Sequence, residues 1–195
     1  KGVLIDPTLL STLPKRFIHD GMGEVIKYGC IRDRALFELL EKLDDQSIFD
    51  HWEEIIERCC QSKADIVEHD VFDMGERMML NFGHTIGHAI EGCYGFGHYT
   101  HGEGVAAGMS MLTGVTEAMG LTKAGTTARL RKVIKQYGLP TDVDASAEDL
   151  IPYISNDKKM RGNHITLVII EEIGKARLLP LAAEDLPKYI RKKDA

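Results

Sequence analysis

The residues best placed to do chemistry lie in the stretch 81–88, where two histidines stand among glycines. His84 and His88 are four residues apart, so a helix would present both imidazoles on one face. Zinc peptidases of the His-Glu-x-x-His type use the Glu that follows the first His as their general base. Thr85 occupies that place here, so the pattern lacks the base that this peptidase chemistry requires.

Two glycines, Gly83 and Gly87, each precede one of these histidines. A glycine inside a helix costs about 0.5–1 kcal/mol relative to alanine. Their presence therefore indicates that another segment approaches the backbone closely. The histidine pair alone is equally consistent with a helix packed against a second helix, in which the imidazoles are ordinary core residues.

A third imidazole and a carboxylate would complete a metal site of nitrogen and oxygen ligands. His98 and His101 follow a glycine-rich stretch, and His101 opens the next apolar segment. Glu24 lies among apolar residues and glycines, which makes it a candidate carboxylate, although it could equally pair with Lys27 on a solvated helix face. Such a ligand set suits zinc or a related divalent ion.

Cations form a second group in or beside the same segments. They are Lys27, Lys63, Arg77, Lys158, Lys159 and Arg161. On a continuous helix, Arg77, Asn81 and His84 would face the same way because they are spaced four and three residues apart. Taken singly, each cation is explained as a surface charge. Together, beside a metal site, they favour a pocket for an anionic, oxygen-rich small molecule.

The elements that must position these residues are mostly helical. Apolar periodicity predicts helices over about 14–29, 33–43, 50–69, 78–91, 102–119, 124–137 and 184–193. The β-branched run 165–170 predicts a buried strand, and 176–181 can pair back on it through Gly174. Residues 3–5 predict one more short strand, which would be the last strand of a preceding unit. We therefore expect a mainly α domain over 1–195 with a small β-hairpin.

Composition excludes several classes of protein. The 195 residues suit one domain, and the net charge of −6 disfavours a general nucleic-acid binder or an anionic-membrane binder. No apolar run approaches the roughly 18 residues of a membrane span. The four cysteines form no Cys-x-x-Cys pair, so they predict free thiols in a reducing cytoplasm rather than a zinc finger. The first residue is Lys1, and we expect a fragment of a longer protein.

Five motifs in this order resemble 3-dehydroquinate synthase. They are the segments 21–29, 63–67, 75–91, 101–109 and 157–159. The resemblance begins near residue 4, runs almost to the end and covers only the C-terminal half of the family's protein. It implies an N-terminal NAD-binding domain that this chain lacks, and a homodimer at full length. It also implies NAD, a divalent metal (zinc or cobalt) and conversion of 3-deoxy-arabino-heptulosonate 7-phosphate to 3-dehydroquinate and phosphate in the shikimate pathway.

The same resemblance implies roles for individual residues. The metal ligands would be Glu24, His84 and His101. The residues that bind the sugar phosphate substrate would be Lys63, Arg77, Asn81, His88, Lys158 and Lys159. The residues that act in catalysis would be Lys27, Arg77, Asn81 and His88. The family often has Glu four residues before the motif arginine, where this chain has Asp73, so the place of that carboxylate in the site stays open.

Three alternatives remain beside this interpretation. Cyclases that make deoxy-inosose or valiolone units from other sugar phosphates share much of the metal motif. A second alternative is a metal- and NAD-dependent alcohol or glycerol dehydrogenase, although that group lacks this set of cations. A non-catalytic helical domain would use the histidines only as core residues. Under the dehydroquinate synthase interpretation, the isolated chain should turn over little or no substrate, because its cofactor half is missing.

Overall fold

The computed structural model describes residues 2–70, 75–95, 97–155 and 163–190. The α-helices in this part of the chain are α1 (Lys15–Ile31), α2 (Arg34–Leu40), α3 (Trp52–His69), α4 (His84–Tyr94), α5 (His101–Ala118), α6 (Thr126–Gln136) and α7 (Ala147–Ser155). Short 3-10 helices are η1 (Pro7–Thr12), η2 (Ser47–His51), η3 (Glu76–Asn81) and η4 (Ala183–Tyr189). The strands β1 (His164–Glu172) and β2 (Lys175–Ala182) form one antiparallel hairpin. The expected mainly α fold with a β-hairpin is confirmed.

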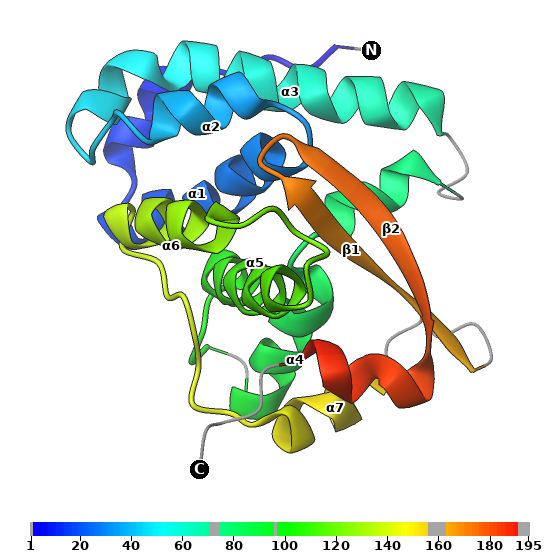
Figure 1. Cartoon of the computed structure of the whole chain (residues 1–195). Coiled ribbons are helices and arrows are strands. Elements are labelled where there is room, and N and C mark those ends of the chain that lie inside the picture. The colour runs from blue at the N-terminus through cyan, green and yellow to red at the C-terminus, as the bar shows by residue number, and fades with distance from the viewer. Residues whose placement is uncertain (1, 71–74, 96, 156–162, 191–195) are drawn as a thin grey trace.

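Helix α5 is the centre of the arrangement (Figure 1). It packs against α4, α1 and α6, while α7 covers α4 and the pair α2 and α3 lies beyond α1. Small residues such as Gly104, Ala106 and Gly108 are buried along α5. Because small side chains let helix backbones come close together, this composition allows α4 and α1 to bring their own residues next to the start of α5.

The hairpin separates two apolar cores. Val168 and Ile170 of β1 pack in the core that contains α1, α2, α3 and α6. Ile165, Leu167 and Ile169 pack in the core of α4, α5, α7 and η4. Side chains alternate between the two faces of a strand, so a continuous apolar run buries both faces. This explains why the central residues 167–170 of β1 are all apolar and buried.

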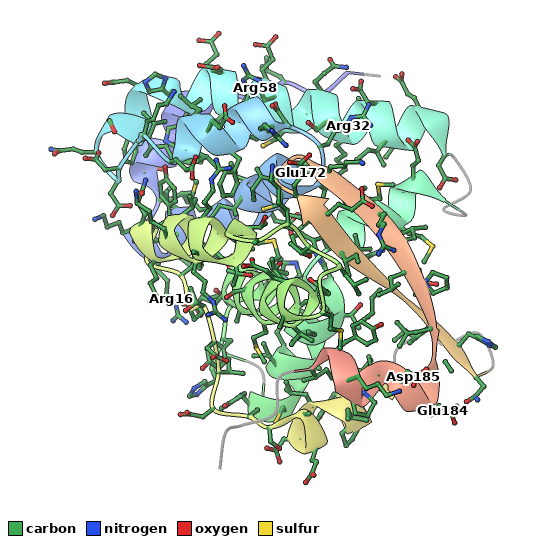
Figure 2. The ribbon with its side chains drawn as sticks, in the orientation of Figure 1. Arg16, Arg32, Arg58, Glu172, Glu184 and Asp185 are labelled. Carbon is green, nitrogen blue, oxygen red and sulfur yellow. The ribbon has the colours of Figure 1, made fainter. Side chains whose placement is uncertain are left out.

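Side chains fix several helix ends and contacts. The Asp33 carboxylate accepts a hydrogen bond from the Leu36 N–H at 2.9 Å and caps α2. Arg58 reaches from α3 to the same carboxylate at 3.0 Å, and Glu172 pairs with Arg34 at 2.8 Å (Figure 2). These contacts hold the outer helices and the hairpin around the core.

Four local expectations differ from the structure. Residues 3–5 form no strand, since no described strand lies beside them, and Val3 and Leu4 are 90% and 96% exposed. The terminal helix is the 3-10 segment η4 with Pro187 inside it. Helix α7 was not expected, because Pro152 interrupts its pattern. The expected helix over 78–91 is broken at Phe82 and Gly83.

The cysteines and the lengths of the apolar helices were also subjects of prediction from the sequence. All four cysteines are free thiols. Among the described helices, none combines the length and the apolar character that a membrane crossing needs.

Candidate metal centre

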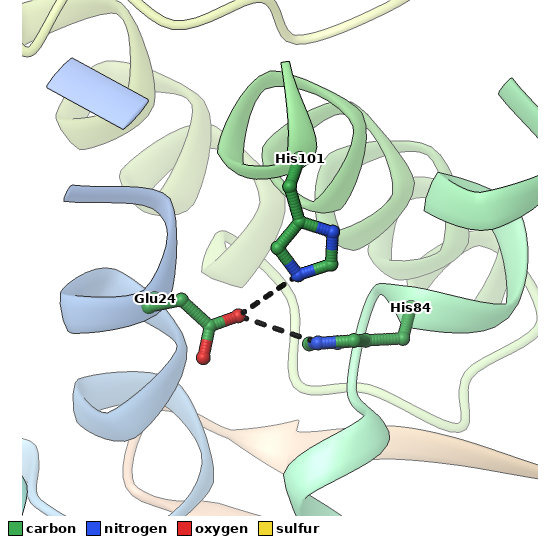
Figure 3. Close-up of side chains that lie close together, drawn as sticks. All are labelled: Glu24, His84 and His101. Carbon is green, nitrogen blue, oxygen red and sulfur yellow. Dashed lines mark ion pairs between the residues drawn. The ribbon is translucent and has the colours of Figure 1, made fainter. Parts of the chain in front are cut away.

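Three helices each bring one ligand-bearing side chain to the same point. Glu24 comes from α1, His84 begins α4 and His101 begins α5, as Figure 3 shows. The Glu24 Oε1 atom lies 3.3 Å from the Nε2 atom of His84 and 3.8 Å from the Nε2 atom of His101. The three ligand atoms lie within 4.8 Å of one another. One carboxylate and two imidazoles thus converge without any shared helix.

Glycines make this convergence possible. A Cβ atom on Gly23 would lie 2.6 Å from the Gly102 carbonyl oxygen, so only glycine allows α1 to approach α5 this closely. A Cβ atom on Gly87 would lie 3.0 Å from the backbone of Gly104. The close approach expected from the glycines of the sequence is therefore observed.

Gly83 has a further role, because it sets the start of α4. Its φ of +79° is in the left-handed region that favours glycine, and it separates η3 from α4. A Cβ atom there would also lie 2.6 Å from the Val105 carbonyl oxygen. The break means that Arg77 and Asn81 belong to η3 while His84 belongs to α4. The prediction of one continuous helix that would align these three residues is therefore wrong.

A neighbouring acceptor holds the Nδ1 atom of each imidazole. The Nδ1 atom of His84 lies 3.1 Å from the Phe82 carbonyl oxygen, which can only accept a hydrogen bond. The Nδ1 atom of His101 lies 2.9 Å from the Glu91 Oε1 atom. With Nδ1 donating in each ring, Nε2 is the nitrogen that faces Glu24 and is left to bind a metal ion, which is the orientation that a metal ligand needs.

Lys27 supplies the positive charge that balances Glu24. Its Nζ atom lies 2.6 Å from the Glu24 Oε2 atom, and its side chain is only 4% exposed. Burial lowers the pKa of Lys27, and the charge of nearby Lys63 adds to that effect, whereas Glu24 opposes it. Burial would raise the pKa of Glu24, but His84 and Lys27 outweigh burial and bring it to about 2. The carboxylate is therefore ionised near neutral pH.

The donor set fits a divalent metal. Two imidazole nitrogens and one carboxylate oxygen are the ligands that zinc binds in catalytic sites, where a fourth position is left for substrate or water. The Glu24 Oε1 atom is buried and, among the described residues, receives no well-aligned hydrogen bond, although both Nε2 atoms face it. A buried carboxylate oxygen without a donor is costly unless a cation occupies that position.

The other predicted site residues are placed as follows. The His88 ring lies 5.6 Å from that of His84 and 5.8 Å from that of His101, so it joins the imidazole cluster. Lys63 is exposed on α3 and acts electrostatically on Lys27. Arg77 and Asn81 are half-buried on η3. Asp73, Asp157, Lys158, Lys159 and Arg161 lie outside the described residues.

Sequence reasoning gave no role to three residues that support this site. Glu91 follows His84 by seven positions and His88 by three, so it shares their helix face, and this spacing could have identified it. Thr100 and Glu103 form a reciprocal capping box at the start of α5, a pattern also readable from the Thr-x-x-Glu spacing. The cap fixes the first turn of the helix that carries His101.

Comparison with known proteins identifies the family of the chain. Residues 21–160 match the family model described as 3-dehydroquinate synthase C-terminal. The chain is 48% identical over 193 residues to the 3-dehydroquinate synthase of Clostridium acetobutylicum, covering 98% of this chain and 54% of that protein. It is 46% identical to the enzyme of Streptococcus pneumoniae over 194 residues, covering 98% and 55%. The chain thus spans about half the length of the curated relatives it matches.

Solved structures share the fold. The 2-epi-5-epi-valiolone synthase of Streptomyces hygroscopicus, solved with NAD+ and Zn2+ bound, superposes with a TM-score of 0.83 at 21% identity over 95% of this chain and 53% of that one. A 2-deoxy-scyllo-inosose synthase complexed with carbaglucose-6-phosphate, NAD+ and Co2+ gives 0.80 at 23% identity over 95% and 55%. With its family model matched over most of its length, the chain belongs to the 3-dehydroquinate synthase C-terminal family.

Proposed function

We propose that this chain is the metal- and substrate-binding part of a 3-dehydroquinate synthase. The reaction would convert 3-deoxy-arabino-heptulosonate 7-phosphate to 3-dehydroquinate and phosphate. The observation that carries the proposal is the meeting of Glu24, His84 and His101 from three separate helices, with Glu24 Oε1 facing both Nε2 atoms at 3.3 and 3.8 Å. A non-catalytic core has no need to gather two imidazoles and a carboxylate with a buried oxygen, unpartnered among the described residues, at one point.

Sequence identity favours this substrate over those of related cyclases. The relatives named 3-dehydroquinate synthase are 42–48% identical to the chain. The valiolone and deoxy-inosose synthases are 21–23% identical. Substrate-contacting side chains diverge sooner than a fold does, so the higher identity supports the heptulosonate phosphate.

The bound metal would be zinc or cobalt, held by Glu24, His84 and His101. A divalent ion held by these residues would supply Lewis-acid chemistry toward the hydroxyl and carbonyl groups of the substrate. The chain's own contribution is to hold the three ligands and to balance their charge with Lys27. The buried Lys27 ammonium lies 2.6 Å from Glu24, so it would also stand close to substrate hydroxyls at the site.

The remaining candidates would bind the anionic ends of the substrate. We infer that Lys63, Arg77 and one of Lys158 and Lys159 hold its carboxylate and phosphate as charge-assisted hydrogen-bond donors. Asn81 and His88 would donate hydrogen bonds to the phosphate or to a nearby hydroxyl. Holding both ends of the substrate fixes its reacting carbons, which accounts for much of the rate enhancement in such sites.

The chain spans about half the length of its curated relatives, and further properties are proposed for the complete protein. We propose that an N-terminal domain binds NAD and closes over this one, that the complete protein is a homodimer, and that it works in the cytoplasm in the shikimate pathway. The NAD+ in the valiolone and deoxy-inosose synthase structures supports the cofactor. Nucleic acid and membrane partners are not expected, given the net charge of −6.

Metal titration of the 195-residue chain tests the proposal. Zn2+ or Co2+ is titrated calorimetrically into the chain and into Glu24→Ala, His84→Ala and His101→Ala. Each variant should lose most of the affinity, because a three-ligand site cannot hold the ion tightly with two. His98→Ala is the matched control, since His98 is exposed and its ring stacks on Tyr94 at 5.2 Å. Equal affinity in all four variants and the unmodified chain would overturn the metal site.

A further inference from the structure

Glu91 contacts the candidate metal centre without belonging to the ligand group that faces Glu24. It lies on α4, one turn beyond His88, and its Oε1 atom is 2.9 Å from the Nδ1 atom of His101 on α5. Only 21% of its side chain is exposed. Its Cγ and Oε1 atoms lie 3.4 Å from the place where a Cβ atom on Gly104 would stand, so glycine there makes room for this side chain.

The contact decides which nitrogen of His101 faces the metal position. Because an imidazole carries its two nitrogens on different edges, a hydrogen bond at Nδ1 turns the Nε2 atom toward Glu24, 3.8 Å away. A carboxylate oxygen accepts the hydrogen bond, so Nδ1 carries a proton and Nε2 is the nitrogen left to bind a metal ion. The Nδ1 atom of His84 is held in the same way, by the Phe82 carbonyl oxygen at 3.1 Å.

His101 depends on such a partner more than His84 does. The His84 side chain is 13% exposed, and its partner is a backbone carbonyl two residues away. The His101 side chain is 45% exposed and stands at the first residue of α5. A half-exposed side chain at a helix end has several rotamers, and each unproductive rotamer or tautomer reduces the fraction of molecules that can bind an ion.

We propose that Glu91 is a positioning residue that holds His101 in the rotamer and tautomer required for metal binding. This rests on the proposed metal site at Glu24, His84 and His101. The competing arrangement makes Glu91 a direct ligand of a second ion, together with His88 and His101, whose ligand atoms also lie within 4.8 Å of one another. The 2.9 Å separation of Nδ1 and Oε1 is an ordinary hydrogen-bond length, which favours the positioning role.

The test compares Glu91→Ala with Glu91→Gln in the 195-residue chain. Glu91→Ala removes the acceptor and should weaken Zn2+ or Co2+ binding about 10- to 100-fold, as is typical for the partner of a metal-bound imidazole. Glu91→Gln keeps an acceptor oxygen and should restore affinity to within a few-fold of the unmodified chain. Glu148→Ala, at an exposed carboxylate on α7, is the matched control and should leave affinity unchanged. All variants should bind one ion per chain.

A second readout does not need the metal. Long-range 1H–15N correlation spectra of the imidazoles distinguish the two tautomers. In the metal-free chain His101 should carry its proton on Nδ1, and Glu91→Ala should give a mixture of tautomers while His84 is unchanged. Far-UV circular dichroism on the same samples establishes that each variant is folded, and Glu91→Gln provides the comparison if Glu91→Ala is not.

The outcomes separate the two proposals. If Glu91→Ala binds the ion as tightly as the unmodified chain while His84→Ala does not bind it, the positioning role fails and the metal site stands. If the chain binds two ions and Glu91→Gln is as weak as Glu91→Ala, Glu91 is a ligand and the positioning role is again overturned. If His84→Ala and His101→Ala also bind normally, the metal site itself fails.

Discussion

Gly23 of α1 and Gly102 of α5 touch backbone to backbone, and each stands next in sequence to a candidate metal ligand. A Cβ atom on Gly23 would lie 2.6 Å from the Gly102 carbonyl oxygen. Glu24 follows the first glycine and His101 precedes the second. The contact that packs the two helices is therefore also the contact that brings the carboxylate and the imidazole together.

Substituting Gly102 should break this contact. A Cβ atom on Gly102 would lie 1.9 Å from the Asp20 carbonyl oxygen, a backbone atom that cannot rotate away. Gly102→Ala should therefore force α1 and α5 apart, lower the free energy of unfolding by about 1–3 kcal/mol or more, and weaken Zn2+ binding. Urea unfolding and zinc titration measure the two effects.

Gly21 provides the matched control for that substitution. It lies in α1 two residues before Gly23, and a Cβ atom there would meet nothing within 4 Å. Gly21→Ala should stabilise the chain by up to about 1 kcal/mol, because alanine has the higher helix propensity. If Gly102→Ala were as stable as the unmodified chain, the close packing of α1 on α5 would not position the ligands.

The buried ammonium of Lys27 should stabilise the metal-free chain. Its Nζ atom is 2.6 Å from Glu24, and its side chain is 4% exposed. Lys27→Met keeps the apolar stem but leaves Glu24 without its cation, which should cost about 1–3 kcal/mol of unfolding free energy. Lys132→Met, at an exposed lysine on α6, should change it by no more than about 0.5 kcal/mol. Equal losses in the two variants would contradict a role for the Glu24 pair.

Glu117 should make stability depend on pH at a point far from the ligands. Its carboxylate accepts hydrogen bonds from the N–H groups of Gly125 at 2.9 Å and Thr127 at 2.7 Å, at the start of α6. Burial raises the pKa of Glu117, but the hydrogen bonds from Thr127 and Gly125 outweigh it, and the net pKa is lowered. A lowered folded-state pKa adds stability above the ordinary pKa, and this stability is lost as pH falls through the folded-state pKa.

The measurement compares Glu117→Gln with the unmodified chain at several pH values. At pH 7 the variant should be less stable by about 1 kcal/mol, as for the loss of a helix cap. The difference should shrink as the pH falls below about 4.5, the ordinary pKa of the carboxyl group, because the unfolded chain takes up a proton there and the folded chain does so only at lower pH. Glu57→Gln, at an exposed residue on α3, should show no such trend. A difference that stays constant down to pH 3 would show that the charge of Glu117 does not matter.

The sequence allowed prediction of elements whose signals are local. The β-branched run of β1 and the helical periodicity of α3 and α5 are strong patterns, and these elements formed where expected. Helix α7 was missed because Pro152 weakens its pattern, and it forms because its apolar face packs on α4. The break at Gly83 was missed because positive φ there depends on packing against the Val105 carbonyl of another helix.

The candidate site likewise combines residues that sequence motifs indicate with contacts that only the fold creates. The motifs indicated Glu24, His84 and His101 through resemblance, but no pattern along the chain measures how close three helices come. That distance depends on pairs of glycines, such as Gly87 and Gly104, which are far apart in sequence and touch only in the fold. The role of Glu91 likewise depends on a contact between α4 and α5.

The proposed division of the reaction between two domains gives a last prediction, on turnover. The 195-residue chain with NAD and 3-deoxy-arabino-heptulosonate 7-phosphate should release little or no phosphate, because the NAD-binding domain that we propose would lie outside it. Fused behind the N-terminal half of the Clostridium acetobutylicum relative, which is 48% identical over the shared part, the chain should gain phosphate release. His84→Ala in the fusion should abolish it, while His98→Ala should not. Turnover by the chain alone would contradict the division, and release from glucose 6-phosphate or sedoheptulose 7-phosphate instead would identify another sugar phosphate cyclase.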